Sequence, residues 1–408
     1  MAGRDNTIGP VTSEEAGKLA VQFEYQAVGK LIFGAGTAAR LGQELSALGA
    51  QKVLVVMDPA VAAQAAGRRV MQRLEEAGIE AELFTDITPE PEPEQADRAA
   101  EQARQMQAQA VVGVGGGSAM DVAKAAGVLV TNPGKATDYV GLGLVKQPGL
   151  PVVCMPTTAG TGSEVTFTAV FTRRRDGFKG GINSPYLYPR MAILDPELTL
   201  GCPPKVTAAA GLDALTHAVE AYLSRAANPL SDIHALKAVE LVGAHLEQAY
   251  NDGTDIDARE GMMLAAYMGG IALALAGVGL VHAMAYPLGA IFGIGHGEAN
   301  AMLLPHILPF NAPACTPRLA DLARAVGVEG ASEEAAAEGF IHWVKELCAR
   351  LGIPRWLRDA GVDPARVKEM AQRAMGVARP IANNPRPVTA AEVERLFLEA
   401  MGPRQEEV

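Results

Sequence analysis

The 408-residue chain has few of the features that mark disulfide-rich, membrane-spanning or nucleic-acid-binding proteins. Its four cysteines are scattered and contain no CxxC pair, which argues against a disulfide framework or a thiolate metal cage. Aromatic residues are only 5% of the chain, so the core must be largely aliphatic. The formal net charge of −11 would repel a phosphate backbone, and we therefore expect no nucleic-acid partner.

Long apolar runs are also missing. The longest, around residues 269–281, is interrupted by glycines and is shorter than the roughly 18–20 residues that a membrane helix needs. Residues 1–20 form a polar leader without the apolar centre of a signal peptide. We therefore expect a cytoplasmic protein that does not associate with membranes.

The chain is long enough for two domains, and its pattern changes near residue 200. Apolar strand-like runs at 53–58, 81–86, 110–117 and 150–157 are separated by amphipathic stretches at 65–78, 94–109 and 118–130. This alternation predicts an α/β domain with a parallel sheet at residues 21–200. From Lys205 onward the periodicity is almost only helical, which predicts an all-α domain at residues 201–408. The active site is expected in the cleft between them.

A glycine turn follows the third predicted strand. Gly115, Gly116 and Gly117 would let the backbone approach an anion, and the next helix would point free N–H groups at it. Ser118 is predicted as the N-cap of that helix, with Asp121 completing a capping box. The alternative is a tight strand–helix turn that binds no ligand.

Two further segments point to a nucleotide. Asp58, at the end of the first predicted strand, could accept hydrogen bonds from ribose hydroxyls and would repel a 2′-phosphate, which favours NAD over NADP. A cap before Pro59 explains Asp58 equally well. The loop at residues 156–164 is rich in small and hydroxylated residues, including Thr157, Thr158 and Thr161, and its composition suits a loop that wraps a ligand.

Four residues in the helical half suggest a metal site. Asp213 and His217 are four residues apart on one helical face. His282 precedes a stretch in which Pro287 and several glycines are predicted to break the helix, so that His296 returns on a loop. Three imidazoles and one carboxylate suit Fe²⁺ or Zn²⁺ rather than Ca²⁺ or Mg²⁺. Each histidine could instead be structural.

Several strings in this order resemble the iron-containing (group III) alcohol dehydrogenase family: GGGSAMDVAKAAG, PTTAGTGSEVT, KGGINSPYLYPRMAILDPEL, GLDALTHAVEAY and HAMAYPLGAIFGIGHGEANAMLLPHILPFN. The likeness runs from about Phe23 to Thr389. It implies an N-terminal dinucleotide-binding domain and a C-terminal helical metal-binding domain.

The resemblance also implies roles for individual residues. It places the metal on Asp213, His217, His282 and His296, and Asp58 on the adenosine ribose. It places Gly117, Ser118 and Asp121 at the pyrophosphate, and Thr157, Thr158, Thr166 and Lys179 along the rest of the cofactor site.

The chain departs from the family pattern at two positions. Tyr286 stands where many members have a second histidine that is thought to serve the proton pathway, and Glu90 stands where relatives often have asparagine. We predict that Tyr286 takes part in proton transfer. Members with tyrosine at this position resemble 4-hydroxybutyrate-type hydroxyacid dehydrogenases.

The sequence therefore predicts a metal-dependent, NAD-linked alcohol dehydrogenase that interconverts primary alcohols and aldehydes, uses Fe²⁺ or Zn²⁺ and assembles as a homo-oligomer. Short ω-hydroxy acids are the second choice of substrate. A lyase of the same architecture, resembling 3-dehydroquinate synthase, and a non-catalytic NAD-binding protein are the rival hypotheses.

Overall fold

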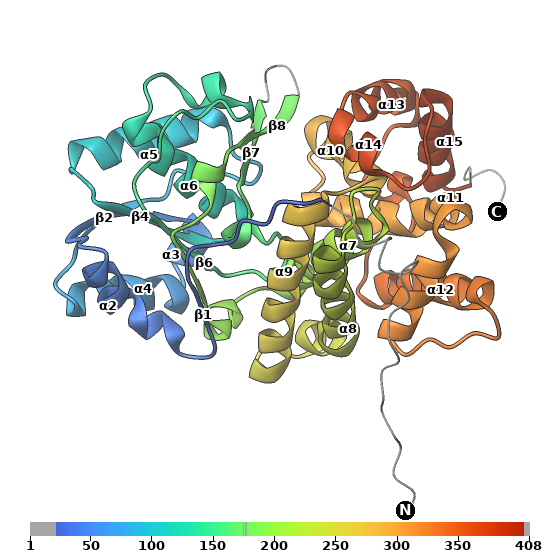
Figure 1. Ribbon diagram of the computed structural model, residues 1–408, viewed down its shortest axis with the longest axis horizontal. Helices are drawn as coiled ribbons and strands as arrows, with labels where there is room; N and C mark the ends of the chain where they lie inside the picture. Colours follow the sequence, from blue (N-terminus) through green and yellow to red (C-terminus); the bar gives the residue numbers. More distant parts are fainter. Residues whose placement is uncertain (1–21, 174, 176–177, 404–408) are drawn as a thin grey trace, which may run out of the picture.

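The computed structural model describes residues 22–173, 175 and 178–403, and the predicted polar leader lies outside these residues. A sheet flanked by helices forms the N-terminal half, and helices form the C-terminal half (Figure 1). The change from strands to helices falls between β9, which ends at Leu194, and α7, which begins at Pro204. Division into two domains near residue 200 remains a proposal.

Six strands of the described chain form one sheet in the order β1-β9-β6-β4-β2-β3, and the pairings between them are parallel. Their bounds are β1 (Leu31–Phe33), β2 (Lys52–Met57), β3 (Glu80–Phe84), β4 (Ala110–Gly115), β6 (Val152–Pro156) and β9 (Met191–Leu194). A smaller sheet of order β5-β8-β7 contains β5 (Gly141–Leu142) and the antiparallel pair β7 (Thr168–Arg173) and β8 (Phe178–Asn183).

Both faces of the main sheet are covered, as its uninterrupted apolar strands require. Alternate residues of β2 point to opposite faces: Leu54 and Val56 join one buried cluster, and Val53 and Val55 join another. Helices α5 (Pro93–Gln105) and α6 (Gly117–Thr131) contribute to the first cluster, and α2 (Leu41–Ala47) and α4 (Ala65–Glu76) to the second. Full burial of each of these aliphatic side chains stabilises the fold by roughly 1.5–3 kcal/mol.

The strands and helices predicted in the N-terminal half are present, with ends shifted by a few residues. The short strands β1 and β9 had not been predicted. They are three and four residues long, and each is held by its parallel neighbours rather than by a long apolar run of its own.

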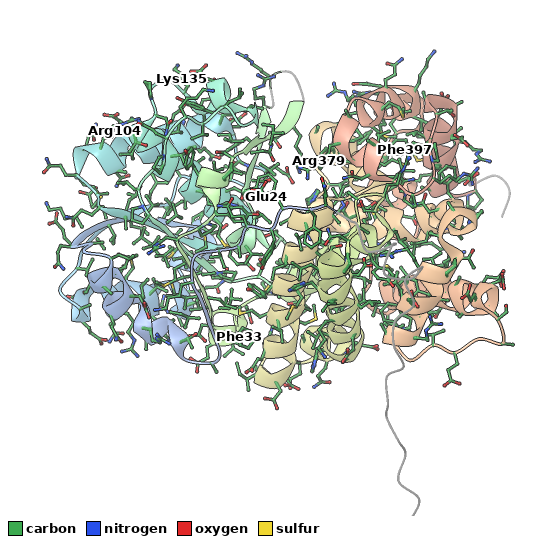
Figure 2. All side chains as sticks on the ribbon, in the orientation of Figure 1. Glu24, Phe33, Arg104, Lys135, Arg379 and Phe397 are labelled. Carbon is green, nitrogen blue, oxygen red and sulfur yellow. The ribbon has the colours of Figure 1, made fainter. Side chains whose placement is uncertain are left out.

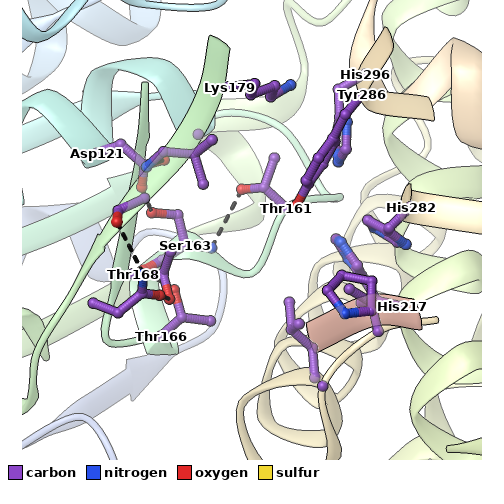
Figure 3. Close-up of a pocket in the computed structure, with 18 of the residues that line it drawn as sticks. Asp121, Thr161, Ser163, Thr166, Thr168, Lys179, His217, His282, Tyr286 and His296 are labelled. Atoms are coloured by element: carbon purple, nitrogen blue, oxygen red, sulfur yellow. Dashed lines mark hydrogen bonds between the residues drawn. The ribbon is translucent and has the colours of Figure 1, made fainter. Parts of the chain in front are cut away.

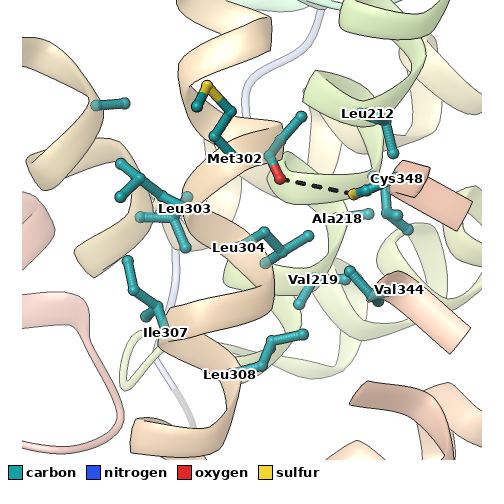
Figure 4. Packing of buried hydrophobic residues seen from close by; sticks show 14 of the residues in the cluster. Leu212, Ala218, Val219, Met302, Leu303, Leu304, Ile307, Leu308, Val344 and Cys348 are labelled. Carbon is teal, nitrogen blue, oxygen red and sulfur yellow. Dashed lines mark hydrogen bonds between the residues drawn. The ribbon is translucent and has the colours of Figure 1, made fainter. Parts of the chain in front are cut away.

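The C-terminal half packs around α7 (Pro204–Leu223), α8 (Pro229–Asn251), α9 (Ile256–Ala276), α10 (Leu280–Phe292) and α11 (His296–Ala325). In Figure 4, Leu304 and Leu308 of α11 face Val219 of α7 and Val344 of α12 (Glu333–Arg350). The short helices α13 (Val367–Met375), α14 (Ala378–Asn383) and α15 (Ala390–Ala400) pack beside α10 and α11.

The apolar helices of this half were tested against the dimensions of a membrane. No single helix in the described part of the chain is long and apolar enough to cross one. Helices α9 and α10 pass on length and composition only as a pair, which is bent by 106°.

Candidate active site

The carboxyl ends of three neighbouring strands bring the predicted nucleotide-binding residues together. Asp58 follows β2, Gly115 ends β4, and Thr157 follows β6. The backbone N–H of Asp58 donates to Val114 O (3.3 Å), and that of Thr157 donates to Gly115 O (3.0 Å). The three segments therefore lie side by side at the edge where parallel sheets bind ligands.

The glycine turn fits a close backbone approach. Gly115 has φ +149°, and a Cβ atom there would lie 2.9 Å from the Ala119 side chain. A Cβ atom on Gly117 would lie 2.9 Å from Thr161 Cγ2, so the turn and the polar loop after β6 are in tight contact. Helix α6 begins at Gly117 with no side-chain cap, which leaves its first N–H groups available for an anion.

The predicted capping roles of Ser118 and Asp121 are wrong. The N-cap is Gly116, two residues before Ser118, and Asp121 is then too far along α6 to reach back. Its carboxylate instead accepts hydrogen bonds from Ser163 Oγ (2.5 Å) and from the Val170 backbone N–H (2.9 Å).

Asp121 belongs to a buried polar cluster with Lys124, whose side chain is fully buried. Lys124 Nζ lies 3.2 Å from Asp121 Oδ1 and donates to Ser163 O (2.8 Å) and Thr168 O (2.5 Å). It also donates to Thr166 Oγ1 at 3.3 Å. One helix, α6, therefore fixes the loop that follows β6 and the start of β7.

A second ion pair joins the small sheet to the segment that carries Glu90. Lys179 Nζ on β8 lies 2.6 Å from Glu90 Oε2, and Thr172 Oγ1 donates to the same oxygen. Burial would raise the pKa of Glu90, but the Lys179 charge and the hydrogen bonds from Lys179 and Thr172 outweigh it and lower that pKa below its usual value. Glu90 has φ 55°, so this contact is made from a backbone conformation that non-glycine residues rarely adopt.

The four predicted metal ligands lie together. Asp213 and His217 come from α7, His282 from α10 and His296 from α11, and one ligand atom of each lies within 4.8 Å of the others. The predicted loop position of His296 is wrong, because His296 is the first residue of α11. The break in the chain is at Gly293, which has φ +71° and ends α10, whereas Pro287 lies inside that helix.

Burial and charge favour the metal-binding protonation states of Asp213, His217 and His296. Burial would raise the pKa of Asp213, but its three imidazole neighbours and Asn300 lower it to about 2. Burial and the Lys179 charge lower the pKa of His296 to about 3, and burial also lowers the pKa of His217. A carboxylate and neutral imidazoles are the forms that bind metals.

The distances suit a small cation. Asp213 Oδ1 lies 3.8 Å from His217 Nε2, 4.0 Å from His282 Nε2 and 3.9 Å from His296 Nε2. Tetrahedral Zn²⁺ sites place such atoms about 3.3–3.6 Å apart, so these three distances exceed that separation by a few tenths of an ångström. Asn300 Nδ2 lies 2.7 Å from Asp213 Oδ1 and 3.1 Å from His282 Nε2, which shows that their lone pairs converge on one small region.

A cavity of about 400 Å³ connects the glycine turn with this cluster. Figure 3 shows Asp121, Ser163 and Thr166 on one side and His217 and His282 on the other. The predicted residues that line the cavity are Gly117, Ser118, Asp121, Thr161, Thr166, Lys179, Asp213, His217, His282, Tyr286 and His296. The predicted residues outside its lining are Asp58, Gly115, Gly116, Thr157 and Thr158, which lie behind it at the strand ends.

Tyr286 lies beside the predicted ligands. The centroid of its ring is 5.9 Å from the centroid of the His296 ring, and Lys179 Nζ lies 5.4 Å from the centroid of the Tyr286 ring. Burial, followed by the charges of Glu220, Glu90 and Asp213, raises the pKa of Tyr286 to about 12. The phenol is therefore protonated at neutral pH. It can pass a proton on, but it is not a base.

Three residues near the site had not been singled out from the sequence: Lys124, Glu220 and Asn300. Asn300 follows His296 by four residues, and Glu220 follows Asp213 by seven, so helical spacing could have indicated both. Lys124 follows Asp121 by three residues, so helical spacing could have indicated that pair, but its other partners Ser163 and Thr168 are distant in the sequence.

Comparison with known families matches almost the whole described chain. Residues 29–196 match the family described as iron-containing alcohol dehydrogenase. Residues 207–401 match the C-terminal part of the Fe-containing alcohol dehydrogenase family. The junction between the two matches coincides with the change from strands to helices.

Individual relatives are similar over most of their length. The chain is 38% identical to long-chain-alcohol dehydrogenase 1 of Geobacillus thermodenitrificans, over 89% of this chain and 93% of that one. It is 35% identical to the NAD-dependent methanol dehydrogenase of Bacillus methanolicus, over 91% and 97%. The crystal structure of a 1,3-propanediol oxidoreductase superposes with a TM-score of 0.91 at 37% identity, over 93% of this chain and all of that one.

Proposed function

The chain belongs to the iron-containing alcohol dehydrogenase family, and from that membership we propose a specific site for its NAD-linked oxidation of alcohols and reduction of aldehydes. The metal is held by Asp213, His217, His282 and His296, and NAD lies along the glycine turn. Primary alcohols are the proposed substrates.

One observation carries this proposal. Four metal-binding side chains from three helices converge on a single cavity, whose opposite wall is the uncapped start of α6. A cofactor whose pyrophosphate lies at Gly117 and Ser118 would extend across this cavity toward the metal. Oxidation of an alcohol needs this arrangement, because the hydride acceptor and the metal must both reach the same substrate molecule.

When bound, the metal supplies a Lewis acid for the alcohol or carbonyl oxygen, and NAD supplies the hydride acceptor. The chain's own residues orient these groups. Lys124 and Asp121 fix the loop that carries Ser163 and Thr166. Tyr286 Oη, protonated at neutral pH, can give its proton toward the cavity while it accepts another.

The substrate end of the cavity favours an apolar alcohol. Leu273, Ala274 and Val278 line it, and so do Val377 and Pro380 at the start of α14. The named relatives act on long-chain alcohols and on methanol, so family membership does not determine the carbon-chain length of the alcohol substrate.

One residue favours a second class of substrate, short ω-hydroxy acids. Arg379, on α14, lines the same cavity and is exposed, and Figure 2 shows it at the junction of the two halves. A guanidinium at this position could bind a substrate carboxylate. If it does, Arg379→Ala raises KM for ω-hydroxy acids and leaves KM for uncharged alcohols nearly unchanged.

For the cofactor we propose NAD rather than NADP, and for the metal Fe²⁺ or Zn²⁺. Asp58 Oδ1 accepts the Ala60 N–H (2.8 Å), so Asp58 does cap the short helix that begins at Pro59. That bond uses one carboxylate oxygen, and the other could still accept a ribose hydroxyl.

The decisive experiment measures bound metal and NAD(H) turnover on one preparation, with primary alcohols, ω-hydroxy acids, NAD and NADP. His217→Ala should lose metal and activity together, while His342→Ala, an exposed histidine on α12, should retain both. Activity that survives in metal-free His217→Ala would refute the proposal. A lyase that recycles its cofactor would not accumulate NADH from simple alcohols.

A further inference from the structure

Glu220 lies next to the proposed metal site and binds one of its ligands from behind. It is buried on α7, at the spacing that places it on the same helical face as Asp213 and His217. Its Oε2 atom lies 2.6 Å from His282 Nδ1, the ring nitrogen that faces away from the other ligands. One helix therefore provides two proposed ligands and contacts a third.

The same carboxylate also holds the start of the helix that carries His282. Oε2 accepts the Gly279 N–H (2.9 Å), and Oε1 accepts the Val281 N–H (2.6 Å). Gly279, the N-cap of α10, offers no side chain, so these N–H groups need an outside partner. A Cβ atom at Gly279 would lie 3.0 Å from Glu220 Oε1, which leaves little room for any other residue there.

These contacts fix the chemical form of the imidazole. A carboxylate can only accept hydrogen bonds, and each of its two oxygens here accepts a backbone N–H. The remaining partner of Oε2, His282 Nδ1, must then carry the hydrogen, and Nε2 keeps its lone pair. A neutral histidine binds a metal only through the nitrogen without a hydrogen.

We propose that Glu220 is a positioning residue that selects the Nδ1–H tautomer of His282 and so directs its Nε2 lone pair at the metal. The inference rests on the proposed function, because it takes His282 as a ligand. A helix cap alone would account for the bonds to Gly279 and Val281, but not for the short contact to the ring.

Glu220→Gln tests this without changing the size of the side chain. A glutamine has one acceptor atom and one donor group, so its NH₂ faces either the Val281 N–H in place of Oε1, or both the Gly279 N–H and His282 Nδ1 in place of Oε2. In the second arrangement it donates to Nδ1 and favours the Nε2–H tautomer, which cannot bind the metal. We expect the apparent Kd for Zn²⁺, measured by competition with a chelator, to rise about 10–100-fold.

A matched control separates this role from helix capping. Asn384 Oδ1 accepts the Leu280 N–H (3.3 Å) at the same helix start, and its other hydrogen bonds in the described part of the chain are to Asn311 and Arg386 rather than to His282. Asn384→Ala should lower the stability of the metal-free protein, as Glu220→Gln does, and leave the Kd for Zn²⁺ close to that of the wild type. Equal losses of Zn²⁺ affinity in the two variants would show that Glu220 acts only as a helix cap and does not position His282.

The tautomer can also be read directly in the metal-free wild type. The chain has seven histidines, so ¹⁵N-histidine labelling of the metal-free wild type gives a tractable spectrum, in which His282→Gln assigns the signal. We expect His282 as the Nδ1–H form in the wild type and a shift toward Nε2–H in Glu220→Gln. A wild-type Nε2–H form would overturn the inference. Failure of the wild type to bind Zn²⁺ would instead refute the proposed metal site.

Discussion

Replacing Lys124 should reveal how strongly the buried polar cluster supports the cofactor side of the cavity. Lys124→Met removes the ammonium and keeps most of the side-chain volume. The change breaks a 3.2 Å ion pair with Asp121 and leaves Ser163 O and Thr168 O without this donor. Breaking a buried pair by removing one partner typically costs about 3–5 kcal/mol, and we expect a loss of unfolding free energy in that range.

The assay is urea unfolding of the wild type, Lys124→Met, Asp121→Asn and the double variant. The two single changes should not add, because each breaks the same ion pair and leaves the other member uncompensated, and a coupling of about 0.5–3 kcal/mol is expected. Lys237→Met, which breaks an exposed pair with Glu240, should stay within about 0.5 kcal/mol of the wild type. KM for NAD should rise in Lys124→Met, since Ser163 and Thr166 line the cavity.

Two results would refute this reasoning. A loss below about 1 kcal/mol in Lys124→Met would show that the ammonium is not needed in its buried position. Additive single variants would show that Lys124 and Asp121 act independently despite their contact.

Three other changes test single residues. Tyr286→Phe should lower kcat without removing an inflection near neutral pH, because the tyrosine pKa is raised to about 12; unchanged kinetics and pH dependence would exclude a proton-transfer role. Glu90 has a lowered pKa in the folded state, so the stabilisation it provides is present above the usual value of 4.5 and is lost as pH falls through the folded pKa. The free energy of unfolding of Glu90→Gln, measured in urea, should therefore fall less on acidification than that of the wild type. Identical pH profiles would contradict this. Asp58→Asn keeps a helix cap and removes the charge, so the ratio of kcat/KM for NAD to that for NADP should fall; an unchanged ratio would leave Asp58 as a cap alone.

Prediction from sequence succeeded where the signal was local. The strand that ends at Gly115 and the helix that follows it were visible from an apolar run, a glycine turn and helical periodicity. The four-residue spacing of Asp213 and His217 likewise depends only on the geometry of one helix.

Prediction failed where a position depended on packing. Pro287 was expected to break a helix, but it lies inside α10, which packs against α11 and α13. Ser118 was expected as an N-cap, but Gly116 takes that place because the first turn of α6 starts where the glycine turn meets Thr161. The assembly state and the cellular location stay predictions.

The sequence by itself determined the class of the fold, the family and the residue types available for chemistry, because periodicity and motif spacing are properties of neighbouring residues. Only the tertiary structure decided which of those residues act together. Lys124 meets Thr168, and Glu220 meets His282, across 44 and 62 positions of the chain. Contacts between such distant residues are set by how helices and strands pack, and packing depends on the whole chain at once.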